Sequence, residues 1–490
     1  MIFDAIGVIL VSGRQCFVTV CHKSLQGIFF SAVVTTAIAL GFHGTSVASN
    51  DYNLTTYVNS TRFQKIHAVV EVRGDLKLNA DGQGVRRIPL RVSGDLHYDE
   101  RNLWDNGVES QRWVRNYEQA HATIKIGETP IETKLRKERR LVLADVEGAQ
   151  QTLISLQGPL TRDELELIDI QGSTALLDQL APQKTVALSA SWHHGDQLVA
   201  QLLGLDAISQ SDVTSTLRQV EGDVAIIDMS GTVSGAVDGV ASDIKLQAKY
   251  NINLQQHRVT WLAMSIRENR AVGHATPGFE VVARIRVAIS KIPDVAELRD
   301  SALEHLSLAA RPGASLLELA SVAGGFRMLH PRDWQVMIDR HDVTVLRQID
   351  HGELIAQCNL SSLPNLPPGE RAALKGFQGD IQRALGSNFG QFVETSQSTN
   401  DQGLRILRAV VAGVSSELPV QWIYYHLSDT SGRQAAIVFT MDAKAVEKFA
   451  GADLGLVSSF AFLQRNRGVP TAADHLDSAE KPVVEVPQRR

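Results

Sequence analysis

The sequence predicts an α+β protein whose first part is a large, curved antiparallel β-sheet with a few short helices, and whose second part is a smaller α/β unit. Two observations lead to this fold class. Apolar and polar residues alternate in many stretches between positions 63 and 290, which is typical of half-buried strands. Helix-breaking residues then cluster between 291 and 325, and shorter strands and helices follow up to 464. Such a change of pattern marks a domain boundary.

The N-terminal stretch has the order of charged, apolar and small residues that directs export. Arg14 and Lys23 precede the apolar run 25–42, and Ser46 and Ala48 follow it. This order predicts a secretory signal peptide that is cleaved after Ala48, so we expect an exported protein of the periplasm, cell envelope or extracellular space. An uncleaved membrane anchor is the alternative, although the run is shorter than the roughly 20 residues of a membrane span. Only that alternative would associate the protein with a membrane.

These patterns divide the chain into five segments. They are a signal peptide at 1–48, a β-rich domain at 49–290, a helical connector at 291–321, an α/β domain at 322–464 and a disordered tail at 465–490. The tail is rich in charged residues, Pro and Gln, a composition that buries too little apolar surface to become ordered.

Charge and cysteine content exclude some functions. The formal net charge is −6, and a nucleic-acid-binding protein would need a basic stripe, so we expect no nucleic-acid partner. Of the three cysteines only Cys358 follows Ala48, so a chain cleaved there has no intramolecular disulfide. Cys358 alternates with the apolar residues Leu354, Ala356 and Leu360, which predicts a buried thiol rather than a nucleophile.

Long strands and two helical stretches make up the first part. Ile244 and Leu246 alternate with Lys245 and Gln247, so one face of the sheet is apolar and the other faces solvent. The apolar face must be covered by helices or hold a ligand. Thr161 is the expected N-cap of the first helical stretch. The expected strands are 66–72, 120–126, 131–135, 140–146, 186–192, 213–220, 223–233, 239–252, 258–268 and 280–290, and the expected helices are 161–180 and 197–205.

The dipeptide Gly-Asp recurs in the first part between alternating runs. It occurs at 74–75, 94–95 and 222–223. Glycine and aspartate favour turns and bulges, so we expect one of these at each position.

The order of strands and helices in 63–290 resembles the half-barrels of bacterial envelope lipid carriers of the lipoprotein-chaperone type. The resemblance is one of architecture, without a signature motif. It implies a curved sheet that half closes on helices and binds a lipid-like ligand on its apolar face.

Helix-breaking residues interrupt and end the connector, and short strands and helices follow it. Pro312-Gly313 interrupts a helical pattern that resumes at 315–322, and Gly324-Gly325 ends it. The strands expected after it are 326–330, 335–339, 343–349, 353–360, 392–396, 404–414, 420–427 and 434–441, and the expected helices are 371–385, 443–449 and 454–462.

The best short motif of the chain opens this second part. An apolar strand beginning at Phe326 runs into Pro331, Trp334 follows three residues later, and Ser458-Ser459-Phe460 closes the segment. This order resembles the PsbP-like superfamily over about 322–464. The resemblance implies an α/β/α sandwich that binds partners and performs no chemistry of its own. Phe326, Pro331 and Trp334 are the candidate site residues, either as anchors for a partner or as structural anchors in the core.

The sequence lacks the short motifs that are typical of catalytic sites or metal centres. His193 and His194 point to opposite faces if they lie on a strand, so they cannot easily share a metal ion. Turns account for the clusters at 339–342 and 350–351. We therefore expect no catalytic residues, no metal ligands and no cofactor.

Two functions from different classes remain open. The favoured one is an exported, non-catalytic cell-envelope protein that binds an apolar, lipid-like ligand or an envelope protein. The alternative is an exported hydrolase or isomerase with a dispersed active site. The apolar face of the long strands discriminates between them, because helices that fill it would exclude a lipid carrier, and a pocket with converging titratable groups would favour an enzyme.

Overall fold

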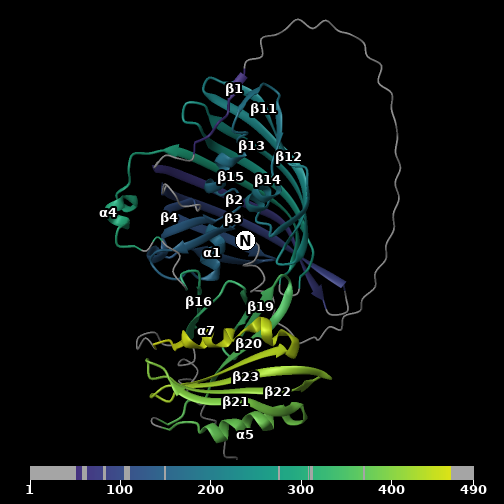
Figure 1. Ribbon diagram of the computed structural model, residues 1–490, viewed down its shortest axis with the longest axis vertical. Coiled ribbons are helices and arrows are strands. Elements are labelled where there is room, and N and C mark those ends of the chain that lie inside the picture. The colour runs from purple at the N-terminus through teal and green to yellow at the C-terminus, as the bar shows by residue number, and fades with distance from the viewer. Residues whose placement is uncertain are drawn as a thin grey trace, which may run out of the picture.

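The computed structural model consists mainly of antiparallel β-sheets with a few short helices, as the α+β prediction requires (Figure 1). It describes residues 51–57, 63–80, 84–103, 111–147, 150–273, 276–306, 308, 313–367 and 370–464. The predicted signal peptide and C-terminal tail lie outside these residues. No helix in the described part is both long enough and apolar enough to span a bilayer.

A sheet of 13 strands, called the large sheet below, forms the first part. Its main path runs β7-β6-β4-β3-β2-β15-β14-β13-β12-β11-β9, with β5 on β4 and β10 on β12. The first and last long strands, β2 and β15, are therefore neighbours in its middle. The bounds are β2 Phe63–Ala80, β3 Gly84–Leu103, β4 Gln111–Ile126, β5 Thr129–Lys134, β6 Leu141–Glu147, β7 Gln150–Ser155, β9 Ser191–His193, β10 Ala207–Ser211, β11 Thr214–Glu221, β12 Val224–Val237, β13 Val240–Asn253, β14 Arg258–Arg270 and β15 Gly278–Lys291. A separate pair joins β1 (Asp51–Asn53) to β8 (Thr185–Ala187).

Strand alternation gives the large sheet two unlike faces, as predicted. On β13 the side chains of Ile244, Leu246 and Tyr250 are buried, whereas Lys245 and Lys249 are exposed. We call the buried side the inner face and the exposed side the outer face. The inner face belongs to one continuous hydrophobic core that also includes the helices.

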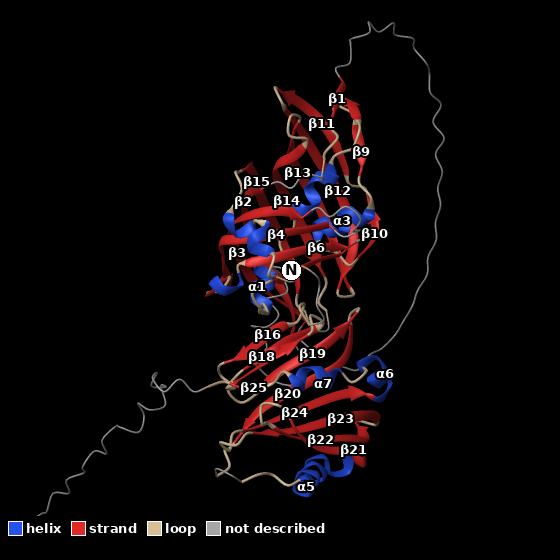
Figure 2. Cartoon of the chain, turned by 60° about the vertical axis from the view of Figure 1, so that its left-hand side comes forward, coloured by secondary structure: helices blue, strands red, loops and turns tan. Residues whose placement is uncertain are grey.

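Short helices cover the inner face (Figure 2). They are α1 (Arg162–Ile168), α2 (Thr174–Leu177), the 3-10 turn η3 (Asp178–Leu180) and α3 (Asp196–Leu203). Thr161 caps α1 in a reciprocal capping box with Glu164, which confirms the predicted N-cap. Leu165, Leu176 and Leu202 are buried against the sheet, so each helix contributes to the core.

The second part is built on a seven-stranded sheet, called the second sheet below, in the order β18-β19-β20-β24-β23-β22-β21. A helix packs on each face: α5 over Val411 and Trp422, and α7 with α6 over the core that contains Phe439. Helices on both faces give the α/β/α layering. The bounds are β18 Trp334–Asp339, β19 Thr344–Asp350, β20 Glu353–Leu363, α5 Leu374–Leu385, η5 Gly386–Asn388, β21 Phe389–Thr399, β22 Arg405–Ser415, β23 Leu418–Ser428, β24 Gln434–Asp442, η6 Ala443–Ala445, α6 Val446–Phe449 and α7 Ala452–Ser458.

The connector is only partly helical. It contains η4 (Ala296–Leu298) and α4 (Asp300–Leu303), but the helix predicted at 315–322 is wrong. That stretch forms β16 (Leu317–Ser321), which pairs with β17 (Phe326–His330), and β17 pairs with β25 (Ala461–Phe462). The physical reason is the spacing of buried residues in β16, which is every second residue and not every third or fourth.

Two further expectations are corrected. The strand predicted at 186–192 is split into β8 and β9. Gly-Asp at 74–75 and 94–95 lies inside β2 and β3 in regular register, and only Gly222-Asp223 forms a turn. A Cβ on Gly74 would come within 2.1 Å of the Glu280 carbonyl oxygen on β15. Glycine is needed there for a close strand approach and not for a bend.

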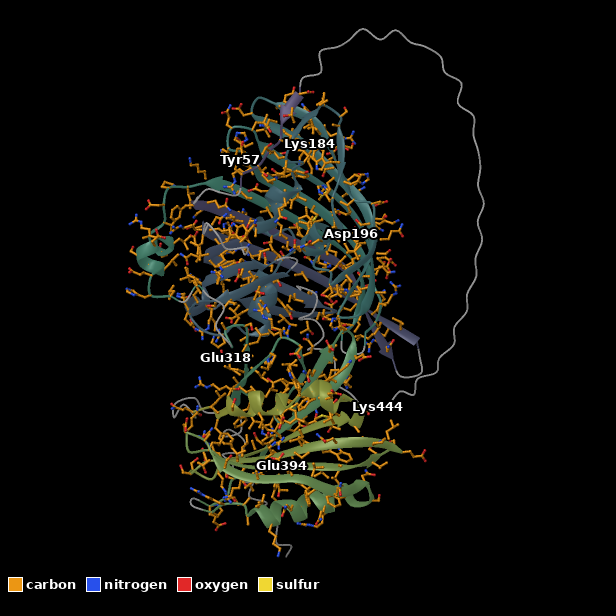
Figure 3. The ribbon with its side chains drawn as sticks, viewed as in Figure 1. Tyr57, Lys184, Asp196, Glu318, Glu394 and Lys444 are labelled. Carbon is orange, nitrogen blue, oxygen red and sulfur yellow. The ribbon has the colours of Figure 1, made fainter. Side chains whose placement is uncertain are left out.

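Polar contacts join the two parts. Nη2 of Arg332 donates to the carbonyl oxygen of Leu153 at 2.6 Å, and Nη2 of Arg162 donates to that of Trp334 at 3.1 Å. Glu318 of β16 accepts from Nη1 of Arg136 at 2.8 Å, and it lies between the two sheets (Figure 3). The large and second sheets thus meet across fixed hydrogen bonds.

Candidate functional site

Two of the predicted site residues, Phe326 and Trp334, lie in the hydrophobic core of the second part, and Pro331 lies beside it. Trp334 is fully buried, with its ring 5.9 Å from that of Phe439 and nearly perpendicular to it. Phe326 is also buried and stacks on Phe460 at 5.5 Å, while Pro331 is half-buried between the two strands. Nε1 of Trp334 has no hydrogen-bond partner among the described residues. An indole in this position can support the core but offers no surface to a partner.

The other residues singled out by the sequence do not converge. His193 is exposed at the end of β9, whereas His194 turns inward and its Nε2 lies 2.7 Å from Oγ of Ser215. Burial lowers the pKa of His194 to about 4. Cys358 is fully buried, and burial raises the pKa of its thiol. The thiol is therefore protonated and unreactive at neutral pH.

The acidic clusters of the second part form turns. Oδ1 of Asp339 accepts from Oγ of Ser321 and Oγ1 of Thr344 at 2.6 and 2.9 Å. Asp350 lies 2.6 Å from Nδ1 of His351 in the turn before β20. These clusters lie at opposite ends of β19, as the sequence predicted.

A buried polar network fixes α2 on the inner face of the large sheet. Oε2 of Glu100 accepts from Nε of Arg115 and from Oγ1 of Thr174, both at 2.7 Å. Oε1 of Glu100 accepts from Nε2 of Gln64 at 2.5 Å, and Arg115 also donates to Oγ of Ser173 at 3.0 Å. Glu100 and Arg115 are almost fully buried. Displacing α2 would leave this ion pair unsatisfied, which is costly in a buried site.

The turn η3 is held in the same way. The carbonyl oxygen of Leu180 accepts from the hydroxyl of Tyr250 at 2.9 Å and from Nε1 of Trp192 at 3.0 Å. Asp178 accepts from the backbone N–H of Val259 at 2.7 Å. The helices are thus tied to the sheet by polar contacts as well as by apolar packing. An apolar ligand that took the place of α2 or η3 would have to break these contacts.

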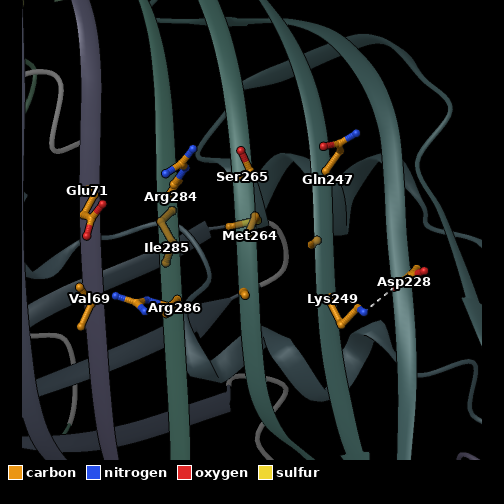
Figure 4. Close-up of a pocket in the computed structure, with 12 residues that line it drawn as sticks. Val69, Glu71, Asp228, Gln247, Lys249, Met264, Ser265, Arg284, Ile285 and Arg286 are labelled. Atoms are coloured by element: carbon orange, nitrogen blue, oxygen red, sulfur yellow. Dashed lines mark ion pairs between the residues drawn. The ribbon is translucent and has the colours of Figure 1, made fainter. Parts of the chain in front are cut away.

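The outer face carries the candidate site, a hollow of about 550 Å³ across five neighbouring strands (Figure 4). Ala263 and Ser265 on the central strand β14 are small lining residues, and longer side chains on the strands to either side form the walls of the hollow. It is lined by Val69, Glu71, Asp228, Gln247, Ala248, Lys249, Ala263, Met264, Ser265, Arg284, Ile285 and Arg286. The hollow therefore presents mostly polar and charged side chains of the outer face.

Two arginines supply exposed positive charge to the hollow. Arg284 and Arg286 are exposed, two residues apart on β15, and so project from the same face. Neither guanidinium has an ion-pair partner among the described residues, whereas Lys249 on the opposite wall lies 3.7 Å from Asp228. Oδ2 of Asp228 also accepts from Arg218 at 3.0 Å. Unpaired guanidinium groups beside small side chains can receive carboxylate or phosphate groups in a bidentate manner.

Sequence reasoning missed this hollow. Strand alternation already places Arg284 and Arg286 on the polar side of one strand, and Ala263 and Ser265 on the polar side of another strand. The missing information was that β14 and β15 are neighbours with Ser265 opposite Arg284. The signal that could have predicted the hollow is a pair of small residues on the polar side of one strand next to a pair of arginines on the polar side of its neighbour.

Comparisons with known proteins do not assign the chain to a family. No protein-family model and no curated protein matches the chain. Among solved structures, the PsbP protein of the cyanobacterium Synechocystis is 13% identical with a TM-score of 0.24, covering 30% of this chain and 92% of its own. Lipovitellin is 8% identical with a TM-score of 0.25, covering 49% of this chain, which spans only 26% of lipovitellin.

The porin OprB of Pseudomonas putida matches at 8% identity and a TM-score of 0.12, over 78% of this chain and 91% of its own. Similarities at these scores support no conclusion on function. The assignment of 322–464 to the PsbP-like superfamily therefore stays a prediction.

Proposed function

We propose that this protein is an exported, non-catalytic binding protein of the cell envelope whose outer face binds an acidic segment of a protein partner. The observation that carries the proposal is the pair of unpaired arginines, Arg284 and Arg286, beside the small residues Ala263 and Ser265. Arginine is enriched at protein interfaces because its planar guanidinium pairs with carboxylates and keeps an apolar stem in contact. A hollow across five strands accommodates several side chains of a partner.

A protein partner is favoured over an apolar ligand by the state of the inner face. Helices α1, α2 and α3 pack on it, and the buried pair of Glu100 and Arg115 holds α2 in place. The lipid-carrier reading needs that face to be accessible. The part of the outer face that forms the hollow is accessible without any rearrangement.

The enzyme alternative receives little support from the hollow. Its two carboxylates, Glu71 and Asp228, lie on β2 and β12, which are four strand spacings apart in the sheet. That distance is about 19 Å, whereas paired catalytic carboxylates lie roughly 5–9.5 Å apart. Asp228 is also engaged by Arg218 and Lys249.

The binding proposal is tested with a fluorescein-labelled octaglutamate peptide and the purified protein, with fluorescence anisotropy as the readout. We expect saturable binding that weakens with salt and at least about ten-fold in the double variant Arg284→Ala/Arg286→Ala, since each charge-assisted pair contributes over 1 kcal/mol. The matched control is Arg73→Ala/Arg91→Ala. These two residues are exposed on the same face, opposite each other on β2 and β3, and outside the hollow.

Equal weakening by both double variants would reduce the effect to general electrostatics and contradict a specific site. Binding of a fluorescent fatty acid such as parinaric acid, unaffected by the arginine variants, would favour the lipid-carrier reading instead. Hydrolysis of the probe would favour the enzyme.

Export is tested separately by N-terminal sequencing of the protein from the envelope fraction. We expect a mature chain that begins at Ser49, because the order of charged, apolar and small residues ends at Ala48. A mature product that retains 25–42 would make the protein membrane-anchored.

A further inference from the structure

A cluster of two histidines and one aspartate lies on the outer face beside the hollow. His67 is on β2, and Asp95 and His97 are on β3. The two strands form a hairpin in which His67 and His97 are directly opposite each other, and Asp95 lies opposite Val69, which also lines the hollow. All three side chains therefore share one face.

Their polar atoms converge on one point. Oδ1 of Asp95 lies 2.9 Å from Nε2 of His67 and 3.2 Å from Nε2 of His97. The two imidazole rings stack with centroids 4.0 Å apart and an angle of 17° between their planes. One ligand atom from each residue lies within 4.8 Å of the other two. In the described part of the chain no other set of three His, Cys, Asp or Glu side chains is this close.

The spacing matches the needs of a transition-metal ion. Zinc binds histidine nitrogen and carboxylate oxygen at roughly 2.0–2.2 Å, so two ligands of a tetrahedral ion lie about 3.3 Å apart. The observed separations of 2.9 and 3.2 Å require only small movements to admit an ion. Imidazole and carboxylate together are ligands for Zn²⁺ and other divalent transition metals.

We propose that His67, Asp95 and His97 bind one divalent transition-metal ion, for which Zn²⁺ is the probe. The neighbouring cation does not compete for the site, because Nζ of Lys65 lies 3.3 Å from Glu118 and 3.7 Å from Asp99. The three side chains are between 34% and 45% exposed. The remaining coordination positions therefore face solvent and are filled by water or by a group of a partner.

A fourth protein ligand is available on the next strand. His121 of β4 lies opposite Asp95, and its Nδ1 is 3.0 Å from Nε2 of Gln119. Residues opposite each other in a sheet have Cβ atoms about 5 Å apart. A bound ion would draw on His121 only after a change of its side-chain rotamer, so its contribution is secondary.

The test is isothermal titration of the chelator-treated full protein, without a histidine tag, with ZnCl₂. We expect one saturable site per chain and a loss of affinity of at least ten-fold in each of His67→Ala, His97→Ala and Asp95→Asn. His121→Ala is expected to weaken binding less than any of these. Saturating Zn²⁺ should also raise the melting temperature of the wild type, because the ion binds the folded chain.

The matched control is His351→Ala, which removes an exposed histidine that pairs with Asp350 at 2.6 Å but has no third ligand nearby in the part of the chain that the structure describes. It should leave zinc affinity unchanged. Circular dichroism of metal-free variants checks that each is folded. Absence of a saturable site, or the same affinity in the double variant His67→Ala/His97→Ala, would overturn the proposal. The octaglutamate measurements are independent of this result when they are made in chelator.

Discussion

The large sheet and the second sheet differ in how their faces are covered. The second sheet is covered on both faces, by α5 on one and by α6 and α7 on the other (Figure 1). On the large sheet, α1, α2 and α3 cover the inner face, whereas on the outer face η4 and α4 pack over Val114 of β4 and Leu143 of β6, and β13 and β15 carry exposed charged residues such as Lys245 and Arg284. A face without a covering layer is available for a partner without any unfolding. The comparison therefore assigns stability to buried positions of both sheets and binding to the outer face of the large one.

The largest effect is expected in the covered sheet. Trp334→Ala removes a fully buried indole that contacts Phe439 and Phe449, and such truncations lower the free energy of unfolding by about 3–5 kcal/mol. The matched control is Trp261→Ala, on the outer face of the large sheet and only half-buried, which should cost clearly less. Urea denaturation of both variants measures the difference. Equal losses would mean that the outer face supports the core as strongly as the buried faces do.

A somewhat smaller loss is expected on the inner face of the large sheet. Arg115→Met leaves Glu100 buried without its cation, which costs about 3 kcal/mol. The double variant Glu100→Leu/Arg115→Met removes both charges and should recover much of that loss. Denaturation curves of single and double variants form the test. A double variant as unstable as the single one would mean that the hydrogen bonds to Thr174 and Ser173, rather than the charge, fix α2.

Acid should weaken both parts through one histidine each, of which His330 is buried and His194 is partly buried. Burial lowers the pKa of His194 and of His330 to about 4, whereas an unfolded histidine titrates near 6.5. The unfolded chain therefore binds more protons below pH 6.5, so this contribution to stability is present above 6.5 and is lost as the pH falls toward 4. Each histidine should account for roughly 1–2 kcal/mol of loss between pH 7 and 5.

The check compares the pH dependence of unfolding for wild type, His194→Gln and His330→Gln. Each variant should show a shallower loss of stability between pH 7 and 5, since glutamine does not titrate. The exposed control His351→Gln should follow the wild type. A variant curve parallel to that of the wild type would show that the histidine is already accessible to protons in the folded chain.

The smallest effect on stability is expected on the outer face. Arg284→Ala/Arg286→Ala should change the free energy of unfolding by less than about 0.5 kcal/mol for each substitution, because neither guanidinium has an ion-pair partner among the described residues. Octaglutamate binding should nevertheless weaken at least ten-fold. Thermal melts and anisotropy on the same samples separate the two quantities. A large loss of stability would assign these arginines to the fold.

Much of the fold could be predicted from local pattern. The capping box at Thr161, the faces of β13 and the burial of Cys358 all follow from the spacing of neighbouring residues. The helix predicted at 315–322 was wrong, because the buried residues Leu317, Leu319 and Ser321 recur at every second position, as in a strand. The expectation of a turn or bulge at Gly94-Asp95 is wrong, because β3 continues through it and carries Asp95 and His97 on one face.

The sequence by itself determined which side chains share a face, because alternation along a strand depends only on adjacent residues. Only the tertiary structure decided which strands are neighbours and in what register. The hairpin of β2 and β3 brings His67 opposite His97, and the pairing of β14 with β15 brings Ser265 opposite Arg284. The tertiary structure also decided that helices close the inner face. These outcomes depend on packing between segments far apart in the chain, where the gain from burial must exceed the entropy lost on closing long loops, and no local pattern encodes that balance.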